Sequence, residues 1–163
     1  MSPLWAYFWP VFAFGLILGG GSGSAWFRRK RPLLLIAGIV FAAGGAALWH
    51  GPAGAADRFA ATVEKSARQT LVAWEMGQVQ SHLHHGPLTR RLDLSGMADD
   101  FQRSELVRIM GDVPGVSSAT WSGSAGIPLI VQALLVSALG FVVGLILAYV
   151  VELRRRYNAQ WKW

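Results

Sequence analysis

Histidines are the residues in this sequence whose spacing could support chemistry, because three of them lie within four positions. His82 and His84 are two residues apart, which places their side chains on one face of a strand, and His85 follows directly. Imidazole is a common ligand of transition metals. No carboxylate stands at clear ligand spacing, however, and the turn signal Gly86-Pro87 comes next. We therefore interpret these histidines as a solvated strand end and expect no metal site.

Other groups for catalysis are scarce. The sequence contains no cysteine, which excludes disulfide bonds and thiol catalysis. No serine has the context of a nucleophile elbow, and Asp99-Asp100 is typical of a helix N-terminus. His50, at the edge of an apolar segment, could contact the magnesium or iron of a pigment, but an interfacial histidine without a ligand is the simpler interpretation. We expect no catalytic residues, no cofactor of its own, and a protein that is not an enzyme.

A basic cluster divides the N-terminal region into two apolar segments. The cluster consists of four consecutive residues: Arg28, Arg29, Lys30 and Arg31. Neither 1–27 before it nor 33–49 after it contains a charge, and a third uncharged apolar stretch covers 127–151. A helix needs about 20 apolar residues to cross the hydrocarbon core. The sequence therefore predicts three transmembrane helices, two in region 1–50 (about 4–26 and 32–50) and one in region 127–163.

The distribution of charge predicts how these helices are oriented, because lysine and arginine collect on the cytoplasmic side. The 28–31 loop contributes +4, whereas residues 51–126 carry seven Lys/Arg against eight Asp/Glu, a net of −1. The C-terminal tail is basic through Arg154, Arg155, Arg156 and Lys162. We expect a bacterial inner-membrane protein with a periplasmic N-terminus and central domain and a cytoplasmic C-terminus. Both basic clusters are expected to contact anionic membrane lipids, and the pattern indicates no nucleic-acid partner.

The N-terminal region admits two other interpretations. The basic cluster, the apolar stretch after it and Ala53-Gly54-Ala55 are similar to the parts of a signal peptide, but the uncharged segment before the cluster would have no role in one. The glycine-rich stretch 19–24 weakens the inner half of the first helix, so this segment could be re-entrant or interfacial. We expect a full span.

Aromatic and small residues indicate how the helices are placed. Tryptophans stand where the expected helices meet the lipid headgroups, as interface anchors do: Trp5, Trp9, Trp26, Trp49, Trp121, Trp161 and Trp163. Small residues four apart would permit close helix contact, either with other membrane subunits or among the three helices themselves: Gly15, Gly19, Gly38, Ala42, Gly140 and Gly144. The polar side chains expected deep in the third helix are Gln132 and Ser137. Because no charge lies within the spans, a transporter or pump acting alone is disfavoured.

Residues 51–126 have the pattern of a small α+β domain. Asp57 is a candidate N-cap for a first helix, whose apolar stripe comprises Phe59, Val63, Ala67, Thr70, Leu71 and Trp74. Strands are expected over 78–84, 88–95 and 116–121. A second helix, capped by Asp99 or Asp100, precedes the third strand and presents Leu106, Ile109, Met110 and Val113. The order α-β-β-α-β predicts a two-layer domain with both helices on one sheet face.

The second half of this region also carries a sequence motif. Leu92-Asp93-Leu94-Ser95-Gly96 and Ala98 precede a helix opened by Asp99-Asp100, which ends at Val113-Pro114-Gly115-Val116 before a closing strand. The order and spacing of these residues resemble the BON domain, a small periplasmic module of osmotically induced and secretin-associated proteins. The resemblance covers about residues 57–121. The two glycines would permit positive φ at the turns. The resemblance implies an envelope location and binding of phospholipid or protein without catalysis. BON proteins are mostly soluble or lipid-anchored, often with tandem copies, so a single copy between spans speaks against a generic stress role.

These features predict an α-helical membrane protein with three transmembrane helices and a small BON-like periplasmic domain. The favoured function is that of a non-catalytic accessory or scaffolding subunit of a larger inner-membrane complex, and a bioenergetic complex, respiratory or photosynthetic, fits best. It would dock onto other membrane protein subunits through its small-residue helix faces and its periplasmic domain. The alternative is a stand-alone inner-membrane envelope protein whose BON-like domain binds phospholipid or envelope proteins.

Overall fold

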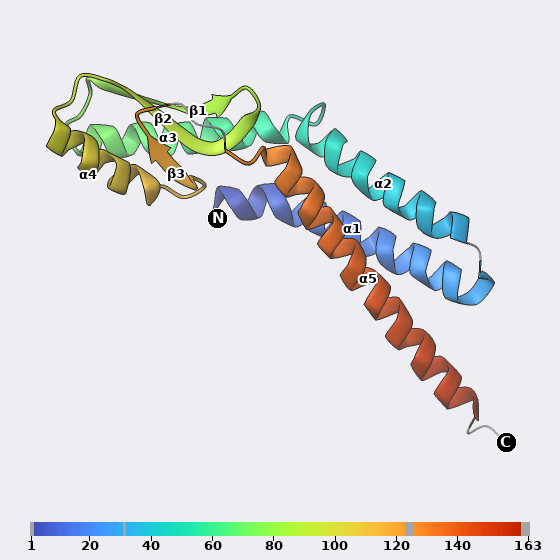
Figure 1. Cartoon of the computed structure of the whole chain (residues 1–163). Coiled ribbons are helices and arrows are strands. Elements are labelled where there is room, and N and C mark those ends of the chain that lie inside the picture. Colours follow the sequence, from blue (N-terminus) through green and yellow to red (C-terminus); the bar gives the residue numbers. More distant parts are fainter. Residues whose placement is uncertain (1, 31, 123–125, 161–163) are drawn as a thin grey trace. The chain divides into compact units, whose positions relative to one another are not determined.

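A computed structural model describes residues 2–30, 32–122 and 126–160 of the chain, which divide into two compact units. The sheet unit comprises the described residues of 1–7 and 54–132, and the helical unit comprises those of 8–53 and 133–163. The expected roles of Arg31, Trp161 and Trp163 lie outside the described residues. Figure 1 shows the elements of both units in the order in which they follow along the chain.

Long apolar helices dominate the chain. They are α1 (Pro3–Arg29), α2 (Pro32–His50) and α5 (Leu129–Gln160). Within the described residues, these three are long and apolar enough to cross a membrane. The protein is therefore a membrane protein, as the sequence predicts. Helix α1 continues without a break through the glycine-rich stretch 19–24 and past Pro10.

Burial in the helical unit follows a repeat of about four residues. Within this unit, the buried residues of α1 are Val11, Gly15, Gly19 and Gly23; those of α2 are Gly38, Ala42 and Ala46; those of α5 are Ala133, Ser137, Gly140, Phe141, Gly144 and Ala148. Positions i and i+4 lie on one helix face, so each helix buries a single stripe. The stripes consist mostly of small residues, because helices in lipid associate by close backbone packing.

The remaining elements build a small mixed sheet flanked by helices. They are α3 (Ala55–Ala73), β1 (Val79–His85), β2 (Leu88–Gly96), α4 (Asp100–Gly111) and β3 (Ser118–Thr120). Strands β1 and β2 are antiparallel, β2 and β3 are parallel, and the order across the sheet is β1-β2-β3. Helix α3 packs beside β1 and α4 beside β3. The order of elements is the one the sequence predicts, with a third strand shorter than the expected 116–121.

The core of the sheet unit is apolar on the side where the helices pack. Leu83, Leu92 and Leu94 of the strands are buried, as are the stripe residues Phe59, Val63, Ala67 and Leu71 of α3 and Leu106 and Met110 of α4. Two expected members of the α3 stripe are different. Trp74 is 57% exposed because α3 ends at Ala73 and Trp74 is its C-cap, and Thr70 is half-buried with its hydroxyl donating to the Ser66 carbonyl.

The helix ends and turns of the sheet unit depend on particular residues. Asp99 is the N-cap of α4, and its side chain and that of Gln102 form a reciprocal capping box. The expected capping of α3 by Asp57 is wrong, since α3 begins two residues earlier behind Gly54, which has φ of 67°. Asp57 lies instead in the first turn, where its negative charge interacts favourably with the helix dipole. Gly96 and Gly115 have φ of 124° and 107°, the positive values expected of them.

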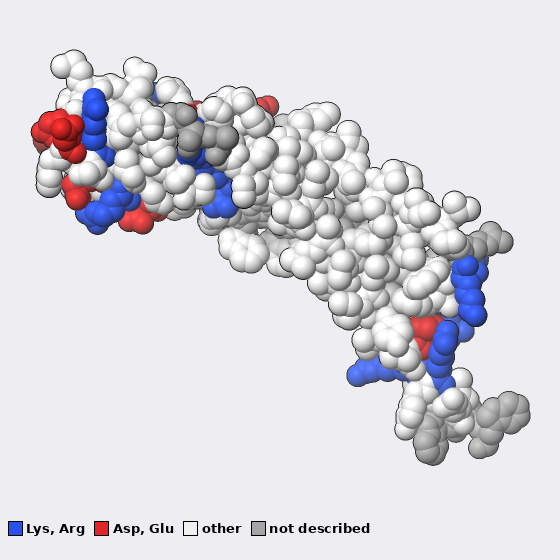
Figure 2. Space-filling view, in the orientation of Figure 1, with Lys and Arg blue, Asp and Glu red and all other residues white. Residues whose placement is uncertain are grey.

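Charges are distributed differently over the two units. The visible face of the helical unit in Figure 2 is uncharged except near one end, whereas basic and acidic residues are mixed over the sheet unit. The charged residues of the helical unit within the described chain are Arg28, Arg29, Lys30, Glu152, Arg154, Arg155 and Arg156. An uncharged helical surface bounded by basic residues is typical of membrane-embedded helices.

Candidate interaction surfaces

The glycines of α1 and α5 bring the backbones of these helices into direct contact. A Cβ atom on Gly15 would collide with the carbonyl oxygen of Ser137, and one on Gly19 with that of Phe141. From the other side, a Cβ on Gly140 would meet the carbonyl oxygen of Phe12. A Cβ on Gly144 would likewise collide with the carbonyl oxygen of Leu16. Of the two roles considered for these positions, contact within the chain is present. Docking onto another subunit stays a prediction.

Helix α2 joins this contact through smaller residues and one buried hydrogen bond. The Ser137 hydroxyl donates to the Ala42 carbonyl oxygen at 3.1 Å, and both residues are buried. A Cβ on Gly38 would lie 2.7 Å from the Ser22 hydroxyl oxygen and 3.1 Å from the Phe141 ring. Ser137, one of the two polar residues expected deep in the third helix, therefore joins α5 to α2. The same residues leave no room for larger side chains.

The expected interface anchors of the helical unit occupy different environments. Trp9 and Trp26 are exposed. Trp5 is exposed too, but this residue, near the start of α1, belongs to the sheet unit. Trp49 is half-buried and, together with Pro10, Phe14, Gly45 and Leu48, lines an apolar recess of about 320 Å³ between α1 and α2. Exposed tryptophans on apolar helices suit the headgroup region. Their depth in a bilayer stays a prediction.

Both basic clusters lie at the same end of the helical unit. The Phe27 ring of α1 lies 5.6 Å from the Tyr149 ring of α5, so the residues that follow them, Arg28 to Lys30 and Glu152 to Arg156, belong to one end. Glu152 forms ion pairs with Arg155 and Arg156. The count of basic residues predicts a common cytoplasmic side, and a shared end is the geometry this requires.

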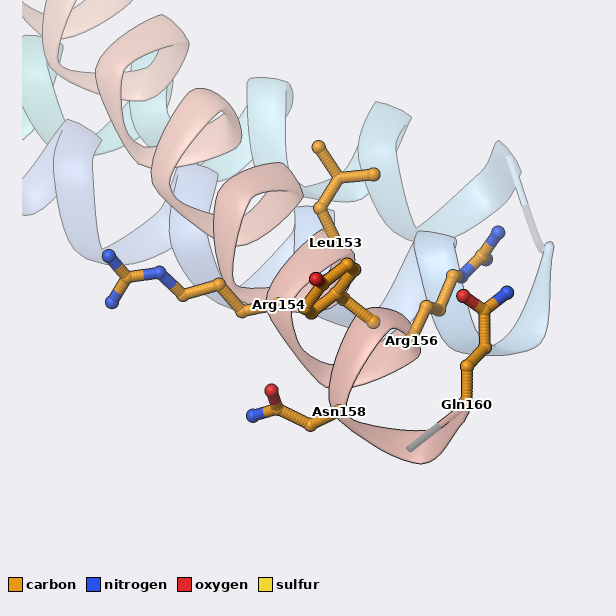
Figure 3. A pocket seen from close by; sticks show the side chains of 6 residues that line it. Leu153, Arg154, Arg156, Asn158 and Gln160 are labelled. Carbon is orange, nitrogen blue, oxygen red and sulfur yellow. The ribbon is translucent and has the colours of Figure 1, made fainter. Parts of the chain in front are cut away.

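A recess of about 730 Å³ surrounds the last turns of α5 and is lined by Leu153, Arg154, Arg156, Tyr157, Asn158 and Gln160. Figure 3 shows that Arg154 and Arg156 extend to opposite sides of the helix. The guanidinium groups therefore do not converge on one anion. Contact of these residues with anionic lipid, as the sequence predicts, would be distributed along the helix end.

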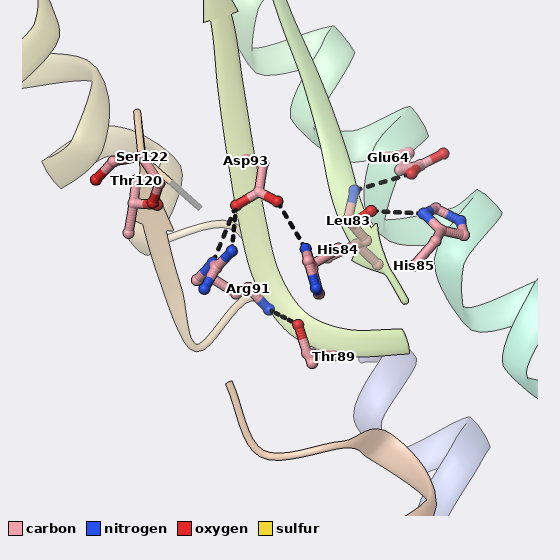
Figure 4. Close-up of polar contacts among 9 residues, drawn as sticks. All are labelled: Glu64, Leu83, His84, His85, Thr89, Arg91, Asp93, Thr120 and Ser122. Atoms are coloured by element: carbon pink, nitrogen blue, oxygen red, sulfur yellow. Dashed lines mark hydrogen bonds and ion pairs between the residues drawn. The ribbon is translucent and has the colours of Figure 1, made fainter. Parts of the chain in front are cut away.

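A polar cluster on β1 and β2 surrounds a buried arginine, as Figure 4 shows. The Arg91 side chain is 4% exposed, and its guanidinium lies 2.8 Å from an Asp93 carboxylate oxygen. The other oxygen of Asp93 lies 3.1 Å from Nδ1 of His84. The Thr89 hydroxyl accepts a hydrogen bond from the Arg91 backbone N–H. Sequence reasoning missed this cluster, although two residues two apart on a strand share a face.

The three clustered histidines have separate partners. His84 contacts Asp93, His85 contacts the Leu83 carbonyl oxygen, and Nδ1 of His82 lies 4.0 Å from a Glu64 oxygen. Within the described residues, no group of three His, Cys, Asp or Glu side chains is arranged to hold a metal ion. His50 is the last residue of α2 and is half-buried.

Arg90 connects three parts of the sheet unit. Its Nε–H donates to the Gly115 carbonyl oxygen at 3.0 Å, and a terminal nitrogen lies 3.4 Å from the Gln132 side-chain oxygen. Burial lowers the pKa of Arg90, although the group stays charged at physiological pH. The expected position of Gln132 deep in the third span is wrong. It lies in the first turn of α5 and its amide donates to the Ile127 carbonyl oxygen.

Large apolar side chains are exposed on the sheet unit. Met97 and Phe101, which flank the N-cap of α4, are 82% and 74% exposed, and Val72 and Trp74 are exposed at the end of α3. Trp121 is placed differently: its indole N–H donates to the Arg103 carbonyl oxygen, and the Arg103 guanidinium lies 5.3 Å from its ring centre. Exposed apolar side chains on a small folded unit favour contact with another molecule.

Comparison of the chain with protein-family models, with curated proteins and with solved structures gives no match, so these comparisons identify no family. What the structure shows is a membrane protein with three long apolar helices and a small mixed α/β segment.

Proposed function

We propose that the chain is a non-catalytic accessory subunit of a larger bacterial inner-membrane complex, with a bioenergetic complex, respiratory or photosynthetic, as the best fit. The observation that carries this proposal is the exposure of Met97, Phe101, Val72 and Trp74 on a unit whose strand and helix core residues are well buried. A stand-alone domain gains nothing from exposing these side chains, whereas a docking surface needs them.

The helical unit supports the same proposal. Its small residues already pack against each other, so they hold three helices in a compact bundle. Away from its basic end, its remaining surface is mostly apolar, with exposed side chains such as Ile17, Leu33, Ile36 and Phe41 available to lipid or to neighbouring helices.

We propose further that residues 57–121 form a BON-like, two-layer interaction domain on the periplasmic side. Support comes from the order α3-β1-β2-α4-β3, the mixed sheet, and the positive φ of Gly96 and Gly115. The orientation is supported by the basic residues of α1 and α5 that share one end of the helical unit. That end would face the cytoplasm.

The proposal is tested by native electrophoresis of membranes extracted with a mild detergent. We expect the chain to migrate with a larger complex, and Phe101→Asp to release it because a charge is placed on an apolar contact. Ala61→Asp, at an exposed position of α3, is the matched control and should leave migration unchanged. A chain that migrates alone, under conditions that keep other membrane complexes intact, would overturn the proposal.

Binding of phospholipid by the sheet unit is the competing function, and the exposed Trp74 favours it. Asp99 and Asp100 beside Phe101 disfavour contact of that side with anionic lipid. Full-length protein in neutral nanodiscs, mixed with vesicles of anionic phospholipid, separates the two functions. Recruitment of the vesicles that Trp74→Ser abolishes would support the competing function and count against the subunit.

A further inference from the structure

The free edge of β1 is bordered by a groove. Strand β1 is at one edge of the three-stranded sheet, and α3 runs beside it. Between them lies a groove of about 400 Å³, lined by Arg68, Leu71, Val72, Gly77, Val79, Gln80, Ser81 and His82. An edge strand presents unpaired backbone groups, and native proteins usually cover or interrupt such an edge. The groove leaves this part of the edge accessible.

The hydrogen bonds of Leu83 show which backbone groups point away from β2. Its N–H donates to a Glu64 carboxylate oxygen at 2.9 Å, and its carbonyl oxygen contacts the His85 ring, as Figure 4 shows. In an antiparallel pair the N–H and C=O of one residue point to the same side, and the direction alternates along the strand. Ser81, two residues earlier and opposite Leu94, therefore also directs its N–H and C=O toward the open edge.

Glu64 occupies only the Leu83 end of the edge. Its carboxylate accepts from the backbone N–H of Leu83 in the way that the carbonyl of a neighbouring strand would. The N–H of Val79 bonds to the Met76 carbonyl oxygen in the preceding turn. Between these two satisfied positions, the backbone groups of Ser81 face the groove. An extended chain laid there would add a strand to the sheet.

The charge of the groove indicates the chemistry of its occupant. Its lining residues include the cationic Arg68 and no carboxylate, and His82, which also lines it, has its Nδ1 4.0 Å from an oxygen of Glu64 beside the groove. Within the described part of the chain, the structure gives Arg68 no ion pair. A second copy of this chain would bring an identical arginine to the same place, which disfavours pairing of β1 with itself. An acidic segment would complement the groove.

We propose that the β1 edge and the groove beside α3 bind an extended, acidic segment of a partner protein by β-strand addition. Backbone hydrogen bonds to Ser81 would hold the segment, the exposed Val72 would contact its apolar side chains, and Arg68 would pair with its carboxylate. This inference rests on the proposed function, because it names the surface through which the accessory subunit would hold its partner.

A peptide-binding measurement with the full-length protein in detergent tests the proposal. The probe is a fluorescent heptapeptide of alternating threonine and valine with a central glutamate, measured by fluorescence anisotropy. We expect binding below about 1 mM, tighter than for the same peptide with a central lysine. Ser81→Pro removes the outward N–H and should weaken binding about tenfold. Ser81→Ala keeps that N–H and should bind like the unsubstituted chain.

Two further variants test the charge. Arg68→Glu should reverse the preference from the glutamate to the lysine peptide, whereas Lys65→Glu, the same change one turn earlier and outside the groove, should preserve it. Absence of binding by either peptide up to about 1 mM, or equal binding by Ser81→Pro and Ser81→Ala, would overturn the proposal. The proposal would also be overturned if the unsubstituted chain is a dimer in detergent and the Ser81→Pro variant is a monomer, since β1 would then pair with itself.

Hydrogen exchange separates this inference from the proposed function. In the isolated complex, the backbone amide of Ser81 should exchange at least about tenfold more slowly than in the purified chain. If the chain migrates in a complex but this amide is not protected, the groove is not the docking surface and the proposed function stands. If the chain migrates alone, the proposed function fails, and the peptide measurement still decides whether the edge binds a strand.

Discussion

At the scale of single residues, the sharpest feature is the difference between glycines that contact a neighbouring helix and glycines that do not. A Cβ on Gly140 would collide with the backbone of α1, whereas no atom of another described element lies within 4 Å of a Cβ placed on Gly44. A methyl group at Gly140 must push backbone atoms apart. At Gly44 it meets open space and only improves helix propensity.

We therefore predict that Gly140→Ala destabilises the helical unit by about 1–3 kcal/mol, as overpacking does, whereas Gly44→Ala is neutral or slightly stabilising. The double change of Gly140 and Gly144 to leucine should displace α5 from α1 altogether. Unfolding of the full chain by SDS in mixed micelles measures both effects. Equal stability of Gly140→Ala and Gly44→Ala would show that the contact between α1 and α5 is looser than described.

The buried Arg91 gives a second prediction at this scale. Asp93→Asn removes the carboxylate that lies 2.8 Å from its guanidinium, which leaves a buried charge poorly compensated. Because Asp93 is itself about one third exposed, we expect a loss of about 2 kcal/mol in the stability of the sheet unit, less than the roughly 3–5 kcal/mol of a fully buried pair. Glu105→Gln, which removes the exposed ion pair with Arg108, is the control. If chemical denaturation shows a larger loss of stability for Glu105→Gln than for Asp93→Asn, this account is contradicted.

At the scale of elements, α4 shows how a local sequence can set a helix boundary. The side chain of Asp99 accepts from the Gln102 backbone N–H at 2.7 Å, and the Gln102 side chain accepts from the Asp99 N–H at 3.1 Å. We predict that Asp99→Ala destabilises the sheet unit by about 1 kcal/mol, whereas Asp100→Ala, one position inside the helix, costs clearly less. Thermal unfolding followed by circular dichroism provides the measurement. A larger effect at Asp100 would mean that the cap is assigned to the wrong residue.

The elements that could be predicted from the sequence are those determined by local signals. The apolar segments, the turn at Gly86-Pro87 and the Asp99 cap are readable because each depends on neighbouring residues. The start of α3 could not be placed correctly, because Gly54 serves as its N-cap with a left-handed backbone while Asp57 is a stronger capping residue by type.

The contacts of the candidate surfaces were less accessible to prediction, since they join residues far apart in the sequence. The spacing of the glycines indicates a contact face but cannot say which helix covers it. The hydrogen bond of Ser137 to Ala42 and that of Leu83 to Glu64 depend on how the elements meet. Arg91 and Asp93 on one strand gave a usable signal, because alternate residues share a face.

At the scale of the whole molecule, the central question is the orientation of the chain in the membrane. Positive residues of α1 and α5 at one end of the helical unit predict that this end stays in the cytoplasm. The sequence lacks cysteine, so a single introduced thiol reports its own location without background. Met97 on the sheet unit and Asn158 near the end of α5 are both exposed and suit this purpose.

We predict that Met97→Cys reacts with a membrane-impermeant maleimide in intact spheroplasts, whereas Asn158→Cys reacts only after lysis. The reason is that moving the net −1 region 51–126 across the bilayer leaves the clusters at Arg28 to Lys30 and Arg154 to Arg156 on the side where basic residues are retained. The unsubstituted chain, which has no thiol, is the control for unspecific labelling. If Asn158→Cys is labelled in intact spheroplasts and Met97→Cys is protected, the topology is the inverse of the predicted one, with the sheet unit and its β1 groove in the cytoplasm.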